Sequence, residues 1–134
     1  MIDETQLRTA VEQSIHKRIR VNMAHAYCLK TIFRIANEVD PRYGIMANDV
    51  MGRVYDNWEE LIKADYIRER FYSLGGRAVE NWNTGDILFF SLNHNPVDHA
   101  GLALNEREFV HLTKRGLRID QVNKYKPVSA GRLA

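Results

Sequence analysis

Hydrophobic residues recur every three to four positions through the first half of the chain, a spacing typical of helices with one buried face. A first helix, capped by Asp3 or Thr5, is predicted from the stripe Leu7, Val11, Ile15 and Ile19. A second is predicted from Asn22 to Asp40–Pro41, with one face formed by Cys28, Ile32, Ile35 and Val39. After a turn at 42–44, a third helix is expected over Asn48–Ile62, and a short fourth from Tyr66 to Leu74 that ends at Gly75–Gly76.

From Val79 onward the pattern changes to short β segments separated by turns. Ile87–Phe90 is continuously apolar, which is typical of a strand buried on both faces, and Asp86 is expected to hold the preceding turn by side-chain hydrogen bonds to the backbone. Further strands are predicted at His99–Leu104, Glu108–Thr113 and Leu117–Ile119, followed by an extended tail over Tyr125–Ala134. Helices followed by strands indicate an α+β fold, in which N-terminal helices pack on a C-terminal antiparallel sheet.

The length of 134 residues predicts one domain over 1–134, with a helical half at 1–76 and a sheet half at 77–125. Hydrophobic residues make up 45% and charged residues 27%, which excludes a disordered tail, a collagen-like chain and a coiled-coil rod. No run approaches the roughly 20 apolar residues of a membrane span, and charged residues interrupt the first twenty positions, so we expect no membrane association and synthesis in the cytoplasm without a signal peptide. The net charge is only +2 and the densest basic run, His16–Arg20, is short, so no nucleic-acid partner is expected.

Cys28 is the only cysteine, which excludes an internal disulfide and a paired-cysteine zinc site. His99 and His111 lie on consecutive predicted strands. A loop at Leu104–Glu106 would place the two imidazoles directly opposite each other on one face, with Cβ atoms about 5 Å apart, whereas a register shift of two residues makes them diagonal neighbours and a shift of one separates them. A helix carrying Cys28 is expected to cover that face, because Ile32 and Ile35 must pack on the sheet. A Cys, a His and a polar residue that orients the His would form a thiol hydrolase site.

Four linked segments of the sheet half resemble the C-terminal half of NlpC/P60-type papain-like cysteine peptidases. They are Gly85–Ser91 (GDILFFS), His99–Leu104 (HAGLAL), Phe109–His111 (FVH) and Gly116–Ile119 (GLRI). The family pattern is a G-D-[LI]-x-F-F strand, an H-[VA]-G-[IL] strand with the catalytic His, a [FY]-[IV]-H strand and commonly a G-[VL]-R-[IV] strand, in the same order at similar separations. The linked region, residues 85–119, is about a quarter of the chain. The resemblance implies that the fold has a papain-like NlpC/P60 core.

The resemblance also implies a catalytic triad, with Cys28 as the nucleophile, His99 as the base and His111 as the residue that orients the base. Members typically cleave amide bonds in cell-wall peptides, so the implied activity is that of a thiol protease or amidase acting on a peptide or peptidoglycan fragment, without a cofactor. The backbone N–H of Cys28 would be one oxyanion-hole donor, and His25, Asn22 and Tyr27 are candidates for the second. The residues expected to contact the substrate are Tyr27, His94 and Asn22. A phage particle, cell lysis or a specialised secretion system would deliver such an enzyme to the wall.

Two other functions are compatible with these residues. The family usually has Asp-Cys-Ser-Gly at the nucleophile, whereas this chain has Tyr27-Cys28-Leu29-Lys30, with no glycine before Gly44. That departure favours a papain-like domain without catalysis, acting as a binding or assembly module, for instance in a phage tail. Alternatively, Cys28, His99 and His111, with Asp98 or His94, are ligand types that suit zinc, and three protein ligands with an open position would suit metal-dependent hydrolysis.

Overall fold

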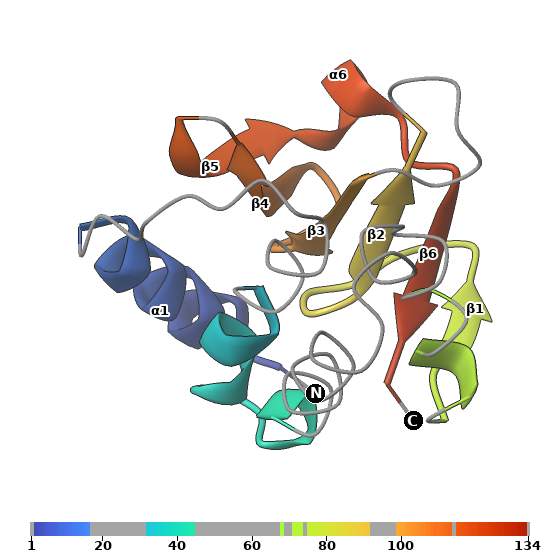
Figure 1. The fold of residues 1–134 in the computed structure, drawn as a ribbon, viewed down its shortest axis with the longest axis horizontal. Coiled ribbons are helices and arrows are strands. Elements are labelled where there is room, and N and C mark those ends of the chain that lie inside the picture. The colour runs from blue at the N-terminus through green and yellow to red at the C-terminus, as the bar shows by residue number, and fades with distance from the viewer. Residues whose placement is uncertain are drawn as a thin grey trace, which may run out of the picture.

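A six-stranded antiparallel sheet forms the centre of the computed structural model, which describes residues 2–16, 32–44, 68, 71–73, 75–91, 99–113 and 115–133. Its strands are β1 (Arg77–Val79), β2 (Ile87–Phe90), β3 (His99–Ala103), β4 (Glu108–Thr113), β5 (Gly116–Gln121) and β6 (Ser129–Arg132). The strand order is β1-β6-β2-β3-β4-β5, and every neighbouring pair is antiparallel (Figure 1). Together with the helices α1 (Glu4–His16) and α6 (Val122–Tyr125), this agrees with the predicted α+β class.

The strands β2 and β4 have the predicted bounds, and β3 and β5 differ from prediction by one or two residues at their ends. The C-terminal segment is different: the unpredicted helix α6 ends at Tyr125, the first residue of the predicted extended tail, and the tail itself contains the strand β6. Strand β6 lies between β1 and β2, with Ala130 opposite both Val79 and Leu88. Backbone hydrogen bonding on both sides therefore makes a strand of the sequence Ser-Ala-Gly-Arg, which has little intrinsic preference for one.

Helix α1 begins where predicted, because the Asp3 carboxylate accepts a hydrogen bond from the Gln6 backbone N–H at 3.0 Å. Its buried face consists of Leu7, Ala10, Val11 and Ser14. The prediction that Ile15 belongs to this face is wrong, since Ile15 is 37% exposed. The buried positions of a helix recur at spacings of both three and four residues, because the helical period is 3.6 residues. The predicted stripe had a spacing of four residues throughout, so its later members turn away from the buried face. Ile19 lies outside the described residues.

Between α1 and β1, the structure describes residues 32–44, 68, 71–73 and 75–76. Residues 32–37 are helical and 42–44, predicted as a turn, are helical as well, whereas the predicted helix at Asn48–Ile62 lies outside the described residues. Residues 71–73 are helical, and this helix ends at Gly75–Gly76 as predicted. There the Gly76 N–H binds the Phe71 carbonyl at 3.0 Å and the Gly75 N–H binds the Tyr72 carbonyl at 3.1 Å. Gly75 has φ +101°, a left-handed conformation that ends helices in this way.

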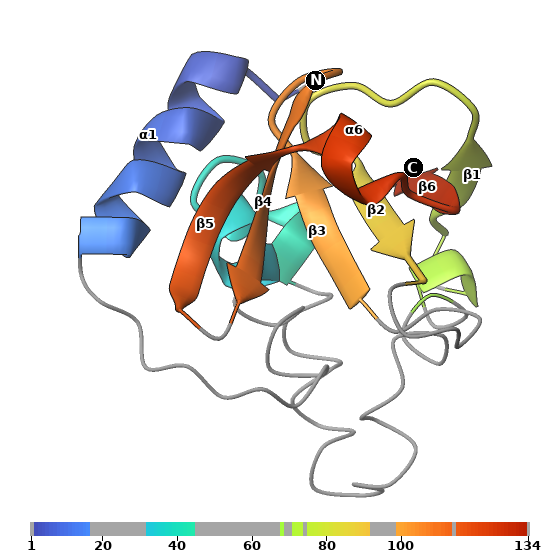
Figure 2. The same cartoon turned by 90° about the horizontal axis from the view of Figure 1, so that it is seen from above.

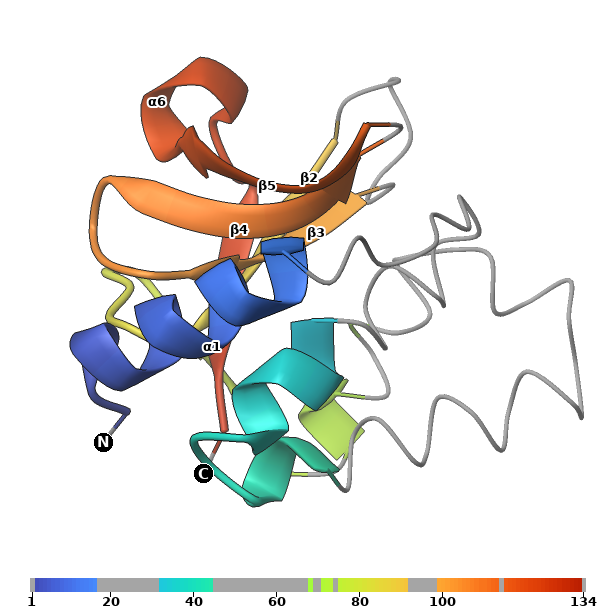
Figure 3. The ribbon, with the colours of Figure 1, turned by 90° about the vertical axis from the view of Figure 1, so that its left-hand side faces the viewer.

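The sheet separates two hydrophobic layers. On one face, Ile87, Phe89, Ala100, Leu102 and Val110 pack with residues from α1 and from 32–36. On the other face, Leu88, Phe90, Ala103 and Phe109 pack with Val122 of α6 and Ala130 of β6. Figure 3 shows α1 and residues 32–44 on one side of the sheet and α6 on the other, and Figure 2 shows the same arrangement from above.

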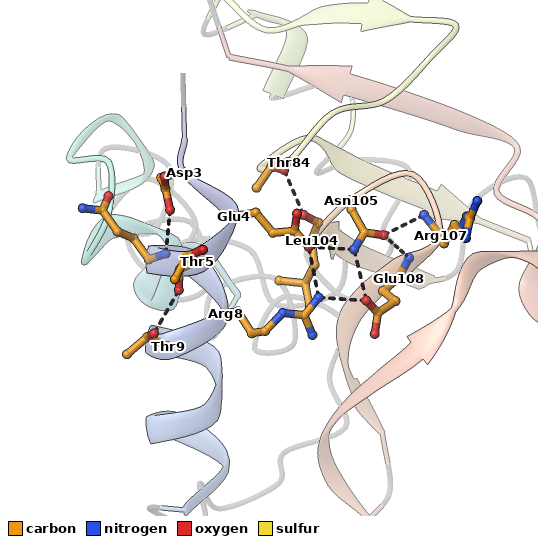
Figure 4. Close-up of polar contacts among 11 residues, drawn as sticks. Asp3, Glu4, Thr5, Arg8, Thr9, Thr84, Leu104, Asn105, Arg107 and Glu108 are labelled. Atoms are coloured by element: carbon orange, nitrogen blue, oxygen red, sulfur yellow. Dashed lines mark hydrogen bonds and ion pairs between the residues drawn. The ribbon is translucent and has the colours of Figure 1, made fainter.

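A polar network joins α1 to the β3–β4 hairpin (Figure 4). The Arg8 guanidinium binds Glu4 at 3.1 Å and Glu108 at 2.8 Å, and the Asn105 amide donates to both carboxylates, at 2.7 and 3.0 Å. The Asn105 side-chain oxygen also accepts hydrogen bonds from the backbone N–H groups of Arg107 and Glu108, both at 2.8 Å. Asn105 therefore shapes the hairpin turn and at the same time fixes it to α1.

Asp86 holds the turn before β2, as predicted. Its carboxylate accepts a hydrogen bond from the Asn83 backbone N–H at 2.7 Å. It is almost fully buried and forms a bidentate pair with Arg132 at the end of β6, at 3.0 and 2.8 Å. Because the pair joins the start of β2 to the end of β6, it helps to fix the pairing of these two strands.

Candidate functional site

The imidazoles of His99 and His111 meet on one face of the β3–β4 hairpin, with 2.7 Å between His99 Nε2 and His111 Nδ1. Their contact was predicted, but the directly opposite register is wrong. Leu102 pairs with Val110 and Ala103 with Phe109, which is the register shifted by two residues. The turn begins one residue later than the register prediction assumed, at Asn105, because the Asn105 side chain accepts the backbone N–H groups on the far side of the turn. The two histidines are therefore diagonal neighbours.

Gly101 makes this diagonal contact possible. Continuing the register places Gly101 opposite His111 and two residues from His99. A Cβ atom at Gly101 would lie 2.6 Å from the ring of Phe109 and 2.9 Å from the Val110 carbonyl oxygen, which is too close. Without a side chain at Gly101, the Phe109 ring can lie beside that of His111, with centroids 4.5 Å apart. The glycine thus leaves room for the aromatic packing that positions His111.

His111 is enclosed by aromatic rings and is only 2% exposed. Besides Phe109, the ring of Tyr125 from α6 lies 5.3 Å away and that of His99 5.0 Å away, centroid to centroid. Burial lowers the pKa of His111, because the charged imidazolium loses solvation, and the hydrogen bond to Asp120 opposes this shift without overcoming it. His111 is therefore a neutral imidazole near pH 7.

Asp120 continues the series. Its Oδ2 lies 2.7 Å from His111 Nε2, and its side chain is 28% exposed. Residue 120 is opposite Phe109 on β5, which places it on the same face as both imidazoles. Sequence reasoning missed Asp120, because the predicted strand ended at Ile119. The alternation of side chains along a strand could have identified it. Arg118 pairs with His111 in the sheet, and Asp120, two residues later, lies on the same face.

The three residues form a hydrogen-bonded series that runs across β3, β4 and β5. His99 begins it and is partly exposed, His111 is buried in the middle, and Asp120 ends it at the partly exposed carboxylate. Because His111 is bound at both ring nitrogens, it cannot rotate without breaking two hydrogen bonds. The series can therefore hold the imidazole of His99 in one orientation, which is what a general base requires.

The imidazole face is not the face on which residues 32–36 pack. Ile32 and Ile35 are buried in the layer with Phe89, Ala100 and Leu102, as their hydrophobic spacing predicted. His99 contacts Phe90, which belongs to the opposite layer. The prediction that Ile32 and Ile35 would pack on the same face as the imidazoles is therefore wrong. Side chains alternate along β2 and β3, so the apolar layer under α1 and the imidazoles must lie on opposite sides.

The remaining predicted site residues lie outside the described residues. They are the nucleophile Cys28, the expected substrate contacts Tyr27, His94 and Asn22, and the further candidates His25 and Asp98. The zinc alternative fits poorly with the described part of the site, because both ring nitrogens of His111 are engaged, by His99 and Asp120. No group of three or more His, Cys, Asp or Glu side chains in the described ranges is arranged to hold a metal ion.

A cavity of about 670 Å³ lies at the other end of the hairpin. It is lined by Trp82, Glu106, Arg107, Gln121, Val122, Asn123, Lys126 and Pro127. Glu106 and Arg107 belong to the β3–β4 turn, whereas His99 is the first residue of β3. Four residue steps separate His99 from Ala103, the last residue of β3 before the turn, and they correspond to about 13 Å. A bond cleaved beside His99 would therefore not lie in this cavity.

Burial of His111 predicts a loss of stability in mild acid. The titratable or charged groups that face it are His99, Asp120, Tyr125 and, opposite it on β5, Arg118. Because its folded-state pKa lies below the ordinary 6.5, the unfolded chain binds more protons than the folded protein as the pH falls below that value. The free energy of unfolding should then decrease, by at most about 1.4 kcal/mol per pH unit for one proton.

Urea unfolding at pH 7.5 and pH 5.5 measures this effect, with the variant His111→Asn as the control, since asparagine does not titrate. The wild-type protein should lose more stability between the two pH values than the variant. Equal losses would show that His111 does not contribute to the pH dependence.

Comparisons with known proteins assign no family to the chain. No model of a known protein family matches it, and no curated protein is significantly similar. Within the described ranges, no helix combines the length and apolar character needed to cross a bilayer. The interpretation of the site therefore depends on the geometry of His99, His111 and Asp120 and on the sequence resemblance.

Proposed function

We propose that this protein is a cysteine hydrolase of the NlpC/P60 type, with Cys28 as the nucleophile, His99 as the general base and His111 as the residue that orients His99. The observation that carries the proposal is the 2.7 Å contact between His99 Nε2 and His111 Nδ1. These are the two histidines that the sequence resemblance selects, and a base that is held by a third polar residue is the recurring arrangement of thiol hydrolases. An antiparallel sheet with α1 and the helical residues 32–37 packed on one face is compatible with a papain-like core.

In the proposed reaction, His99 removes the proton of the Cys28 thiol through Nδ1, because its Nε2 is bound to His111. The thiolate sulfur forms a bond to the carbonyl carbon of the substrate, and the carbonyl oxygen becomes an oxyanion that the Cys28 backbone N–H stabilises. The C–N bond breaks as His99 returns the proton to the leaving amine, which leaves an acyl-thioester. A water molecule, deprotonated by His99, then attacks the thioester and releases the acid and the thiol.

The proposed substrate is an amide bond in a peptide, most specifically a cell-wall peptide or a peptidoglycan fragment. This choice depends on the resemblance of residues 85–119 to the NlpC/P60 pattern. A phage particle, lysis or a specialised secretion system would bring the protein to the wall.

A papain-like binding or assembly module without catalysis is the second candidate. The replacement of Asp-Cys-Ser-Gly by Tyr27-Cys28-Leu29-Lys30 favours it, because the residues around the nucleophile differ from those of active members. The two candidates differ in what they require of the thiol. Catalysis needs a thiolate near neutral pH, whereas a binding module does not.

Alkylation by iodoacetamide distinguishes them, and intact-mass spectrometry reports on Cys28 alone because the chain has one thiol. For a thiol whose pKa is two units below the ordinary value of about 8.5, the thiolate fraction at pH 6.5 is about 50-fold higher, and its intrinsic reactivity is about 8-fold lower. The wild-type protein should therefore react about 6-fold faster at pH 6.5 than His99→Ala, and its pH–rate profile should turn over at lower pH.

His16→Ala is the matched control, since it also removes a histidine but lies at the end of α1. It should alkylate at the wild-type rate. If Cys28 of the native protein stays unlabelled until urea is added, it is a buried core thiol, and the proposed enzyme is wrong. Equal rates for the wild type and His99→Ala would likewise remove His99 as the base.

A further inference from the structure

With both imidazoles neutral and Asp120 a carboxylate, the donors and acceptors of the His99–His111–Asp120 series admit one consistent placement of protons. Asp120, as a carboxylate, only accepts, so His111 donates its Nε2–H to Asp120 Oδ2 across 2.7 Å. Neutral His111 has a single ring proton, so its Nδ1 is an acceptor. His99 must then donate its Nε2–H to His111 Nδ1, also across 2.7 Å. In neutral His99 the basic lone pair therefore lies on Nδ1.

We propose that Asp120 is a positioning residue, which acts through His111 to fix the tautomer of His99 that has its basic nitrogen at Nδ1. The inference rests on the proposed function only in that Nδ1 is the nitrogen assigned to take the proton of Cys28. Asp120 itself reaches neither the substrate nor the thiol in this scheme. Its contribution is to make one of two otherwise similar proton arrangements dominant.

The opposite arrangement shows what Asp120 prevents. Without an acceptor at His111 Nε2, His111 can carry its proton on Nδ1 and donate it to His99 Nε2, so that the same nitrogen pair is joined by a reversed hydrogen bond. His99 would then hold its proton on Nδ1 and could not act as a base from that nitrogen. A hydrogen bond to a charged acceptor favours one arrangement over the other by about 10-fold to 100-fold.

The surroundings of His111 support this role. An imidazolium at His111 would donate from both nitrogens and force His99 to accept at Nε2, which would also move the His99 proton to Nδ1. The aromatic rings of Phe109 and Tyr125 disfavour that charged state by burying His111, whose pKa is lowered. His111 is 2% exposed, so water has little access to replace Asp120 at Nε2.

The test compares Asp120→Asn, Asp120→Ala and Asp120→Glu with the wild-type protein, using two measurements. The ¹⁵N chemical shifts of the ring nitrogens of ¹⁵N-histidine-labelled protein report which nitrogen of His99 and of His111 carries the proton, and do not depend on Cys28. The rate of Cys28 alkylation at pH 6.5 reports activation of the thiol. Glu106→Gln is the matched control, because it makes the same carboxylate-to-amide change at the β3–β4 turn, outside the series.

We expect the wild type and Asp120→Glu to hold the His99 proton on Nε2, and Asp120→Asn and Asp120→Ala to show a substantial Nδ1–H population with alkylation slowed about 5-fold. Unchanged proton positions in Asp120→Asn and Asp120→Ala would overturn the inference, whatever the alkylation rate. Altered proton positions with alkylation that is insensitive both to Asp120 and to His99→Ala would support the role of Asp120 in setting the tautomer and overturn the proposed thiol activation. A protein that fails to fold is recognised from its amide spectrum, and Asp120→Glu then provides the comparison.

Discussion

Replacing Cys28 with alanine should abolish amide hydrolysis, lowering turnover by at least about 10⁴-fold, because the chain has no second thiol to form the proposed acyl-thioester. The loss follows from covalent catalysis: without the sulfur, the two easier steps revert to direct attack by water, assisted only by the oxyanion hole and binding. The measurement is mass spectrometry of soluble peptidoglycan fragments incubated with the protein. Each cleaved amide adds one water to the summed mass of the two products.

Cys28→Ser is the matched control for shape, since it exchanges one atom and should be nearly as inactive as Cys28→Ala. Both variants should retain the wild-type far-UV circular dichroism spectrum. A Cys28→Ala variant that still hydrolyses the fragments would show that the proposed nucleophile is wrong. A wild-type protein with an activated thiol and no turnover on wall peptides would leave the thiol chemistry in place and remove this substrate class.

Local patterns predicted the meander β2-β3-β4-β5 well, because each of these strands carries its own signal. Ile87–Phe90 is continuously apolar and Asn105 marks the turn between β3 and β4. Strand β6 carries no such signal: Ser129–Arg132 becomes a strand because two neighbouring strands, far away in sequence, supply partners for its backbone. Propensity reports on local preference, whereas β6 is determined by tertiary pairing.

The candidate site was likewise predictable from local sequence patterns only in part. The period-two alternation of strands predicted that His99 and His111 would share a face, and the actual register depends on where Asn105 places the turn. Which layer covers that face was not predictable from the spacing of Ile32 and Ile35, because an apolar stripe packs equally well on either side of a sheet. Asp120 could have been predicted by extending the predicted strand Leu117–Ile119, which corresponds to β5, by one residue.

His111→Ala should lower turnover by about 10³-fold to 10⁴-fold, the second-largest effect expected, because His99 would lose the partner that holds its ring. His111→Asn should retain more activity, since its amide oxygen can accept the His99 Nε2–H, and asparagine fills this position in the Cys-His-Asn sites of papain-like proteases. The measurement is again cleavage of peptidoglycan fragments. Alanine also leaves a void beside Phe109 and Tyr125, so stability is measured in parallel by urea unfolding.

A double-mutant cycle separates the catalytic effect from the void. If Asp120 acts only through His111, then Asp120→Asn should lower turnover in the wild-type background and have no further effect in the His111→Ala background. Additive losses in the double variant would instead mean that the two residues act independently, for example through stability alone. A folded His111→Ala protein with wild-type turnover would contradict the orienting role of His111. The 2.7 Å contact between His99 Nε2 and His111 Nδ1 would then have no part in catalysis.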